Sequence, residues 1–334
     1  MGADKSKYTV TPVGHIPYFV VEIRGINLNS KHISQETIDM TRILSHQNRI
    51  LIFKDQGIVP AKVHIRVGEW FGPIQPAEMY SHPRAPHPQV LRLSNDPEEG
   101  CVNIGTRGWH IDGSYLMVPY HYSLYHMVAL PTGGSSTLFY PLFELIKSLD
   151  SEQLSRWQRL WIVRYEDNKK RVHPVIYVHP VTGLETMCIH LGGMKCFVWD
   201  RGTPEERWTA KEETDEIVKE IQQAFDKNQS KLMYEHKWEP GDFIISDNLS
   251  VAHLAGQAAR QSRKEVGLRI LHRVSVAGTH RPQKEFRNYV NTYALASDRE
   301  MQSQGFSFGP SLWRCCICRN NGSNSLSADR TYRN

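Results

Sequence analysis

The 334-residue sequence predicts a mainly β fold with flanking helices (α+β), for which a jelly roll is the leading arrangement. Short β-rich segments bounded by Gly, Pro or Asn follow one another from residue 90 to residue 278. A helical pattern interrupts them in one place, and the other helical patterns precede them in the chain. Many short strands at regular spacing favour a closed or double-sheet β architecture.

The elements before residue 90 mix strands and helices. Segment 19–28 (FVVEIRGINL) predicts a strand and a turn, and Ser34 can cap a helix that follows. Segment 49–56 (RILIFKDQ) predicts a buried strand from its apolar run, and Pro60, a residue type favoured at helix starts, begins a second helix. The Pro- and His-rich residues 72–89 predict a loop.

The array after residue 90 consists of predicted strands and one predicted helix. The strands are expected at residues 90–96, 121–130, 136–140, 173–180, 184–191, 241–248 and 268–278. The helix over residues 209–226 has one apolar face, formed by Ile217, Val218, Ile221 and Phe225. The pattern ends after about residue 310. We therefore expect one folded domain over residues 1–310 and a polar, disordered tail over residues 311–334, which contains Cys315, Cys316 and Cys318.

Composition and charge exclude several classes of protein. The net charge is only +5 and no run of five basic residues occurs, so we expect no nucleic-acid partner. No stretch approaches the roughly 18 apolar residues of a membrane span. The six cysteines are scattered and form no disulfide framework, which favours a reducing, cytoplasmic environment. Gly2 fits a loose myristoylation pattern, although a flexible start with an incidental glycine is the simpler interpretation.

The segment GWHIDGSY contains a candidate pair of metal ligands. His110 and Asp112 are two residues apart, so in an extended chain their side chains point to the same face. They would supply two members of the 2-His-1-carboxylate facial triad of non-haem Fe(II) oxygenases. Among 16 His and 35 acidic residues such a pair also arises by chance, as a surface His beside an Asp. His253, placed just after the strand predicted at 241–248, is the candidate third ligand.

Two arginines in the last predicted strand are candidates for binding anions. Arg269 and Arg273 are four residues apart and share one face of the strand with Leu271 and Ser275. Two guanidinium groups that point into a barrel would be costly to bury unless anions accompany them. The alternative is that this face is exposed and that water solvates both arginines.

Taken together, these segments resemble the taurine dioxygenase family of Fe(II)/2-oxoglutarate-dependent enzymes. The likeness runs from about Tyr8 to about Arg281, and the matching stretches agree in order and rough spacing. They are RILIFKDQ, EWFG, GWHIDGSY, LPTGGSSTLF, HPVIYVHPVTG, GDFIISDN with the later His253, and RILHRVSVAG. The family fold is a double-stranded β-helix, a cupin-like jelly roll, which agrees with the pattern of predicted strands. The resemblance implies that residues 1–310 form the catalytic domain.

The resemblance also implies roles for single residues. His110, Asp112 and His253 match the iron ligands. Thr137 matches a residue that helps to bind 2-oxoglutarate, and Arg269 matches the arginine that pairs with its far carboxylate. Arg273 matches an arginine that contacts the acidic group of the primary substrate. The implied reaction uses O2 and 2-oxoglutarate to oxidise a C–H bond by hydroxylation, cyclisation or desaturation, and releases succinate and CO2.

Three departures from the family pattern affect these roles. Arg263 lies closer than Arg269 to the customary spacing from the last iron ligand and is a rival for 2-oxoglutarate, but it lies in the polar segment QSRKE. Thr106 stands where taurine enzymes carry an Asn, and the preceding loop keeps Tyr80 and His82 but lacks another His. Taurine is therefore not the expected substrate. The expected substrate is instead a small anionic molecule, such as a sulfonate, a sulfate ester, a carboxylated amino acid or a specialised metabolite.

Two other classes of function stay open on the sequence. One is a catalytically inactive jelly-roll protein that binds a small molecule. The other is the same iron chemistry on a nucleic acid or a protein side chain, against which the small net charge speaks. A homo-oligomeric assembly is also left open. His126 and Trp109 are expected to pack in the core rather than to act as ligands.

Overall fold

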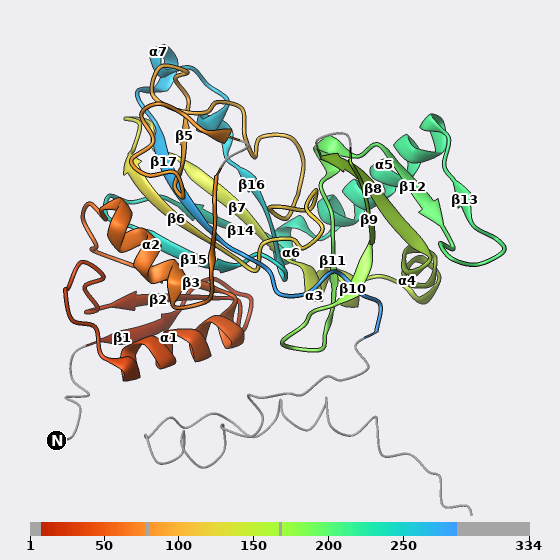
Figure 1. The fold of residues 1–334 in the computed structure, drawn as a ribbon, viewed down its shortest axis with the longest axis horizontal. Helices are drawn as coiled ribbons and strands as arrows, with labels where there is room; N and C mark the ends of the chain where they lie inside the picture. The colour runs from red at the N-terminus through yellow and green to blue at the C-terminus, as the bar shows by residue number, and fades with distance from the viewer. Residues whose placement is uncertain (1–7, 78–79, 167–168, 286–334) are drawn as a thin grey trace, which may run out of the picture. The chain divides into compact units, whose positions relative to one another are not determined.

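Two β-sheets packed face to face form the framework of the chain, and we call this pair of sheets the barrel (Figure 1). The structure is a computed structural model that describes residues 8–77, 80–166 and 169–285. The larger sheet has eight strands in the order β1-β2-β3-β15-β6-β17-β4, with β5 also paired to β17, and the smaller sheet has the order β14-β7-β16. Apart from the parallel pair of β2 and β3, neighbouring strands in both sheets are antiparallel.

The strands match most of the segments predicted from the sequence. The larger sheet contains β1 (Thr9–Pro12), β2 (Val20–Arg24), β3 (Ile50–Phe53), β4 (Ile74–Gln75), β5 (Leu91–Ser94), β6 (Tyr122–Ala129), β15 (Phe243–Asp247) and β17 (Ile270–Val276). The smaller sheet contains β7 (Ser136–Pro141), β14 (Tyr234–Lys237) and β16 (Val251–Ala255). Two details of the predicted strand pattern were wrong. Gln75 and Ile74 form a short strand inside the predicted loop, and His253 lies within β16 rather than after a strand end.

The space between the two sheets is filled by apolar side chains from both. Phe139 and Val251 of the smaller sheet pack in one cluster with Tyr125, Ile244 and Leu271 of the larger sheet. All five side chains are buried. Burial of such side chains contributes about 1.5–3 kcal/mol each, so this cluster holds the sheets together.

Two helices cover the outer face of the larger sheet. These are α1 (Gln35–Asn48) and α2 (Ala61–Glu69). Ser34 caps α1 as predicted, because its side chain accepts a hydrogen bond from the backbone N–H of Thr37 at 3.2 Å. Pro60 is the N-cap residue of α2, also as predicted. Beneath these helices, Leu124 and Val274 belong to a second apolar cluster.

A long insertion separates β7 from β14 and forms a lobe with its own core. We call residues 142–232 the inserted lobe. Its elements are α3 (Leu142–Lys147), α4 (Ser151–Gln158), β8 (Leu160–Glu166), β9 (Lys169–Pro174), β10 (Ile176–Val178), β11 (Glu185–Met187), a 3-10 turn (Leu191–Gly193), β12 (Cys196–Trp199), β13 (Arg207–Trp208), α5 (Lys211–Lys227) and α6 (Gln229–Leu232). Helix α5 was predicted, whereas the short helices α3 and α4 were not. Trp109, which lies outside the lobe, stacks on Phe225 with ring centroids 5.3 Å apart, so its expected packing role is confirmed.

The segment between β16 and β17 contains a 3-10 turn (Gln257–Ala259) and α7 (Arg263–Val266). No helix within the described ranges is long and apolar enough to span a membrane. The predicted boundary at residue 310, the tail cysteines and Gly2 lie outside the described residues.

A buried ionic network joins the two sheets. Asp242, at the start of β15, is fully buried and lies 2.6 Å from Lys54 Nζ and 3.0 Å from His236 Nε2. Lys54 follows β3 of the larger sheet, and His236 belongs to β14 of the smaller sheet. Hydrogen bonds from His236 and Lys54 outweigh the effect of burial and hold the pKa of Asp242 below 3.8.

Replacement of Asp242 by Asn should therefore destabilise the fold. Removing one partner of a buried ion pair leaves the other charge uncompensated and costs about 3 kcal/mol or more. Urea unfolding at pH 7 measures the change. Because folding lowers the pKa of Asp242, this contribution is complete well above pH 4 and is lost as the pH falls through the folded-state pKa.

Asp215→Asn is the matched control, since its ion pair with Lys211 is exposed on α5 and should contribute less than about 1 kcal/mol. Equal losses of stability in the two variants would contradict a structural role for the buried network.

Candidate active site

Reciprocal backbone hydrogen bonds bring His110 and His253 together. The N–H of His253 donates to the carbonyl of His110 at 2.9 Å, and the N–H of His110 donates back at 3.3 Å. This is an antiparallel bridge between β16 and the loop that carries the GWHIDGSY segment. Directly opposite residues of such a pair project to the same side. The imidazole rings accordingly lie with centroids 4.3 Å apart.

Asn248 fixes the backbone of Asp112. Its side-chain oxygen accepts from the Asp112 N–H at 2.7 Å, and its Nδ2 donates to the carbonyl oxygens of Asp112 at 2.9 Å and Tyr120 at 2.7 Å. Asn248 was included in a predicted strand segment but was given no role. Its participation depends on a long-range contact that sequence periodicity does not reveal.

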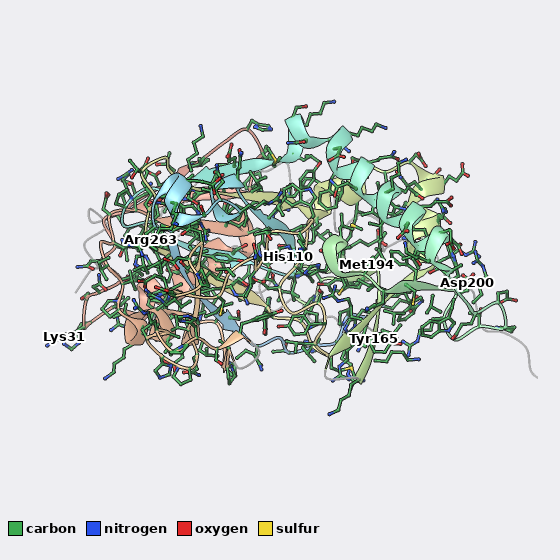
Figure 2. All side chains as sticks on the ribbon, turned by 90° about the horizontal axis from the view of Figure 1, so that it is seen from above. Lys31, His110, Tyr165, Met194, Asp200 and Arg263 are labelled. Atoms are coloured by element: carbon green, nitrogen blue, oxygen red, sulfur yellow. The ribbon has the colours of Figure 1, made fainter. Side chains whose placement is uncertain are left out.

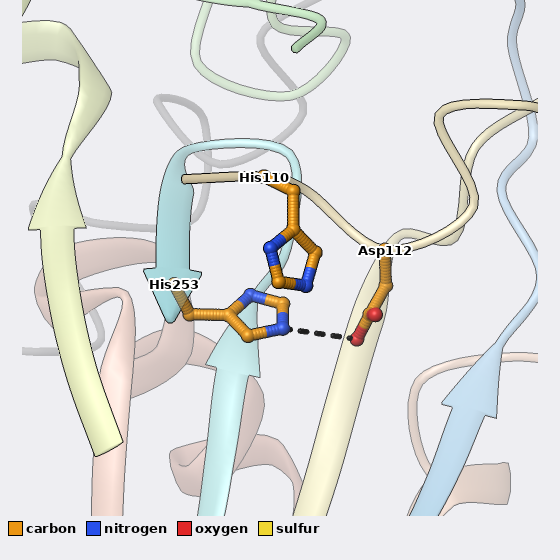
Figure 3. A group of neighbouring side chains, drawn as sticks. All are labelled: His110, Asp112 and His253. Carbon is orange, nitrogen blue, oxygen red and sulfur yellow. Dashed lines mark ion pairs between the residues drawn. The ribbon is translucent and has the colours of Figure 1, made fainter. Parts of the chain in front are cut away.

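The three predicted ligands converge in the structure (Figure 3). One ligand atom from each of His110, Asp112 and His253 lies within 4.8 Å of the others, and all three residues are buried. Figure 3 shows the two imidazoles and the carboxylate pointing toward a common point, with His253 Nε2 3.5 Å from an oxygen of Asp112. Two imidazoles and one carboxylate are the donor set of a non-haem Fe(II) site.

The protonation of these groups suits metal binding. His110 Nδ1 lies 3.0 Å from the carbonyl oxygen of Gly108, so Nδ1 carries the proton and the lone pair of Nε2 is left for a metal. Burial lowers the pKa of His253 to about 3, so this imidazole is neutral. Burial raises the pKa of Asp112, but the charge of Arg273, with a hydrogen bond from Ser123, outweighs burial and holds that pKa below its ordinary value.

A second His/Asp cluster has a different chemistry. His121, His179 and Asp247 also place ligand atoms within 4.8 Å of one another. However, His179 Nδ1 accepts the backbone N–H groups of Val181 and Thr182 at 3.2 Å, so its proton lies on Nε2 and faces Asp247 at 3.1 Å. His179 therefore has no lone pair for a metal, and its pair with Asp247 supports the turn that presents Asn248.

Arg273 and Arg269 both point inward as predicted, but their surroundings differ. Arg273 donates from Nη1 to Asp112 Oδ1, so its charge has a partner inside the protein. Arg269 is 3% exposed and donates from Nε to Ser135 Oγ at 2.9 Å. No carboxylate within the described ranges pairs with Arg269, and burial lowers its pKa to about 10. A buried guanidinium that has no carboxylate partner within the protein is suited to bind the carboxylate of a ligand.

Thr137 and Arg263 lie in contrasting environments. Thr137 is buried in β7, where its hydroxyl accepts from Trp238 Nε1 at 2.9 Å, and it follows the Arg269-bound Ser135 by two residues. Arg263 is exposed on α7 and forms an ion pair with Asp96 at 3.1 Å. The structure thus gives Arg269, not Arg263, a buried position beside Thr137.

A cavity of about 270 Å³ opens onto the candidate metal ligands His110 and Asp112. Its wall includes His110, Asp112, Arg273 and Tyr80. The structure does not bring two of the predicted substrate residues to this wall. His82 bonds to the carbonyl of Pro97 at 3.1 Å, and Thr106 donates to the carbonyl of Asn103 at 3.1 Å. The cavity wall also includes His190 and Tyr115, which were given no role from the sequence. Tyr115 ends the GWHIDGSY segment and His190 lies in a predicted strand segment, but no spacing rule connects either residue with the metal-ligand pair.

Comparison with known proteins identifies the family. Residues 9–275 match the family model described as taurine catabolism dioxygenase TauD, TfdA family. The chain belongs to this family. A TauD/TfdA-type relative in Saccharomyces cerevisiae, an alpha-ketoglutarate-dependent sulfonate dioxygenase, is 26% identical over 263 residues, which cover 72% of this chain and 61% of the relative. The alignment therefore spans less than two thirds of that protein.

Two further relatives of this TauD/TfdA-family chain agree with the assignment. The alpha-ketoglutarate-dependent 2,4-dichlorophenoxyacetate dioxygenase of Cupriavidus pinatubonensis is 21% identical over 281 residues, covering 75% of this chain and 93% of that protein. A solved structure of a taurine dioxygenase from Burkholderia xenovorans superposes with a TM-score of 0.65 at 21% identity, covering 82% of this chain and 92% of that one. The predicted double-stranded β-helix fold is thereby confirmed.

Replacement of one candidate ligand should abolish metal binding without unfolding the protein. His110→Ala and His253→Ala each remove one imidazole donor, so their Fe(II) content after anaerobic reconstitution should fall to less than about a tenth of wild type. Metal analysis and circular dichroism measure the two effects. His121→Ala, from the second cluster, is the matched control and should retain iron. Full iron content in either ligand variant would refute the assignment.

Proposed function

We propose that this chain is an Fe(II)/2-oxoglutarate-dependent dioxygenase that oxidises a C–H bond of a small anionic molecule and releases succinate and CO2. The observation that carries the proposal is the convergence of His110, Asp112 and His253 in a barrel that also buries Arg269 without a carboxylate partner. Family membership and the named activities of the relatives support the same reaction class.

Each residue of the site has a defined task in this proposal. His110, Asp112 and His253 would hold Fe(II), which with 2-oxoglutarate supplies the activation of dioxygen when both are bound. Arg269 would bind the far carboxylate of 2-oxoglutarate through its planar set of N–H donors, beside the hydroxyl of Thr137. Ser123 and Tyr125 donate to the Oδ2 atom of Asp112 at 2.8 and 3.2 Å and so fix the orientation of its carboxylate.

Arg273 is the proposed contact for the acidic group of the primary substrate. It lies in the cavity wall, and one of its N–H groups is used by Asp112. Its Nε is buried and has no hydrogen-bond partner in the described part of the chain, so a donor is left for a ligand. Relatives that act on a sulfonate and on a phenoxyacetate support an acidic substrate.

The inactive binding protein is the weaker alternative. An inactive protein would not need three metal donors in matched protonation states together with an uncompensated buried arginine.

Tyr80 is the other proposed substrate contact, since it borders the cavity. Thr106 and His82 would contribute to substrate binding only indirectly, because their side chains bond to the backbone carbonyls of Asn103 and Pro97.

The first test compares Arg269 with Arg263. Arg269→Ala removes a buried charge-assisted contact worth about 3–5 kcal/mol, so 2-oxoglutarate should bind at least about 100-fold more weakly. Arg263→Ala removes an exposed ion pair and should change the affinity less than about twofold. Anaerobic titration of the Fe(II)-loaded protein with 2-oxoglutarate measures both. The reverse ranking would show that the loop containing α7 supplies the arginine.

The second test uses a panel of sulfonates, sulfate esters, carboxylates and uncharged analogues, scored by succinate release. Acidic compounds should be turned over and taurine should be a poor substrate. Arg273→Ala should lower turnover of the best substrate by roughly 100-fold, because a charge-assisted contact is lost. Iron analysis of the variant checks that Asp112 still binds metal. Efficient turnover of taurine, or of an uncharged compound equally in both proteins, would contradict the substrate assignment.

A further inference from the structure

A second arginine of the inserted lobe approaches the cavity. Arg164 lies in β8 and shares its strand face with Ile162, which packs in the core of the lobe. Its Nη1 donates to the carbonyl of Gly193, the residue after Gly192 of the cavity wall. The charge of Arg164 also acts at short range on groups of that wall, since it lowers the pKa of His110 and His190, although Arg164 itself lies just behind the lining residues. Figure 2 shows that His110 lies between the barrel and the part of the lobe that contains Met194.

Arg164 is half-buried and has no carboxylate partner in the described part of the chain. Its one hydrogen-bond acceptor there is the carbonyl of Gly193. Burial lowers the pKa of its guanidinium below the ordinary value. Strand β8 belongs to a four-stranded sheet of the lobe with the order β13-β12-β8-β9. Arg159 precedes β8 and Arg207 lies in β13; both are exposed and nevertheless pair with Asp200 and Glu213. Of these three arginines, Arg164 approaches the cavity and has no carboxylate partner among the described residues.

The glycine beside Arg164 makes room for its guanidinium. Gly193 does not have a positive φ, so its backbone conformation does not require glycine. A Cβ atom at this position would collide with Arg164 Nη1. The absence of a side chain at Gly193 therefore allows the guanidinium to occupy this place next to the cavity.

With Fe(II) and 2-oxoglutarate bound, the site would carry two more positive than negative charges, because Arg273 would share the single charge of Asp112 with the metal. The charges of Fe(II) and Arg269 would balance those of Asp112 and the two carboxylates of 2-oxoglutarate. Arg273 and Arg164 then remain at the cavity as partly or fully buried cations. Burying such charges without a counterion is costly. Arg107 also borders the cavity, but it is exposed and water can solvate it.

We propose that Arg164 is a second anion-binding position and that the primary substrate carries two acidic groups, of the carboxylate, sulfonate or sulfate type. One acidic group binds Arg273 and the other binds Arg164. The position is a specificity determinant supplied by the inserted lobe, separate from the iron and 2-oxoglutarate positions of the barrel. This inference rests on the proposed function, because it names the substrate class of that site.

The test is a binding measurement that does not depend on turnover. Ethane-, butane- and hexane-disulfonate are titrated calorimetrically, without oxygen, into protein loaded with Fe(II) and 2-oxoglutarate, alongside the monosulfonate of each chain. At the spacer length that fits, the disulfonate should bind wild type about 10-fold or more tightly than its monosulfonate, since one charge-assisted contact is added. Arg164→Gln should abolish this preference and leave the affinity for the monosulfonate unchanged.

Two further variants complete the test. Gly193→Ala should displace the guanidinium while keeping its charge, and so should also abolish the preference, even if Arg164→Gln folds poorly. Arg159→Gln removes an exposed charge from the same sheet and should preserve the preference. No preference in wild type at any length, or a preference that survives both Arg164→Gln and Gly193→Ala, would overturn the proposal.

Succinate release separates failure of this inference from failure of the proposed function. If wild type consumes 2-oxoglutarate in an Fe(II)-dependent manner but shows no disulfonate preference, only the Arg164 position is refuted. If wild type neither binds Fe(II) nor consumes 2-oxoglutarate, the proposed function itself is refuted.

Discussion

The reciprocal backbone hydrogen bonds between His110 and His253 are the constraint on which the site depends. They fasten an irregular loop to β16, so that the loop acquires the positional precision of a sheet. Asn248 extends this attachment by two residues, to Asp112, with one further pair of hydrogen bonds. The relative placement of the three candidate ligands therefore depends on a pair of main-chain hydrogen bonds and on the side chain of Asn248. Asp112 gains its remaining support from Ser123, which belongs to β6 of the larger sheet.

Charge divides the interior into two kinds of site. The Lys54–Asp242–His236 network is satisfied within the protein and links the sheets. Arg269 and Arg164 have no such carboxylate partner in the described part of the chain, and each places an unbalanced positive charge in or beside the barrel. If the proposed ligands bind at Arg269 and Arg164, the uncompensated charges lower the stability of the free protein there, whereas the Lys54–Asp242–His236 network stabilises it elsewhere. This contrast separates functional from structural charges more clearly than burial alone does.

Sequence reasoning found the parts of the site that have a local signature. The spacing of His110 and Asp112 indicated a candidate pair, and the resemblance to the family gave that pair and Arg269 their expected roles. The apolar strand favoured Arg269 over Arg263. The roles of Asn248 and Arg164 could not be predicted, because each depends on a contact with a distant segment and neither stands in a pattern of its own. Periodicity likewise located the long helix α5 but not α3, which is too short to show a period. The pairing of Arg273 with Asp112 could not be predicted either, because the two residues lie far apart in the sequence and meet only in the folded protein.

The strand order has a consequence for how the protein acquires its metal. In the larger sheet, β15 lies between β3 and β6, although about 190 residues separate β3 from β15 along the chain. Strands β3 and β6 are therefore synthesised long before the strand that pairs with both of them, and their unpaired edges are open to aggregation until β15 is made. His253, Arg269 and Arg273 are synthesised after the whole inserted lobe. The candidate ligands His110 and His253 can therefore meet only once β16 has been made and has paired with the loop that carries His110.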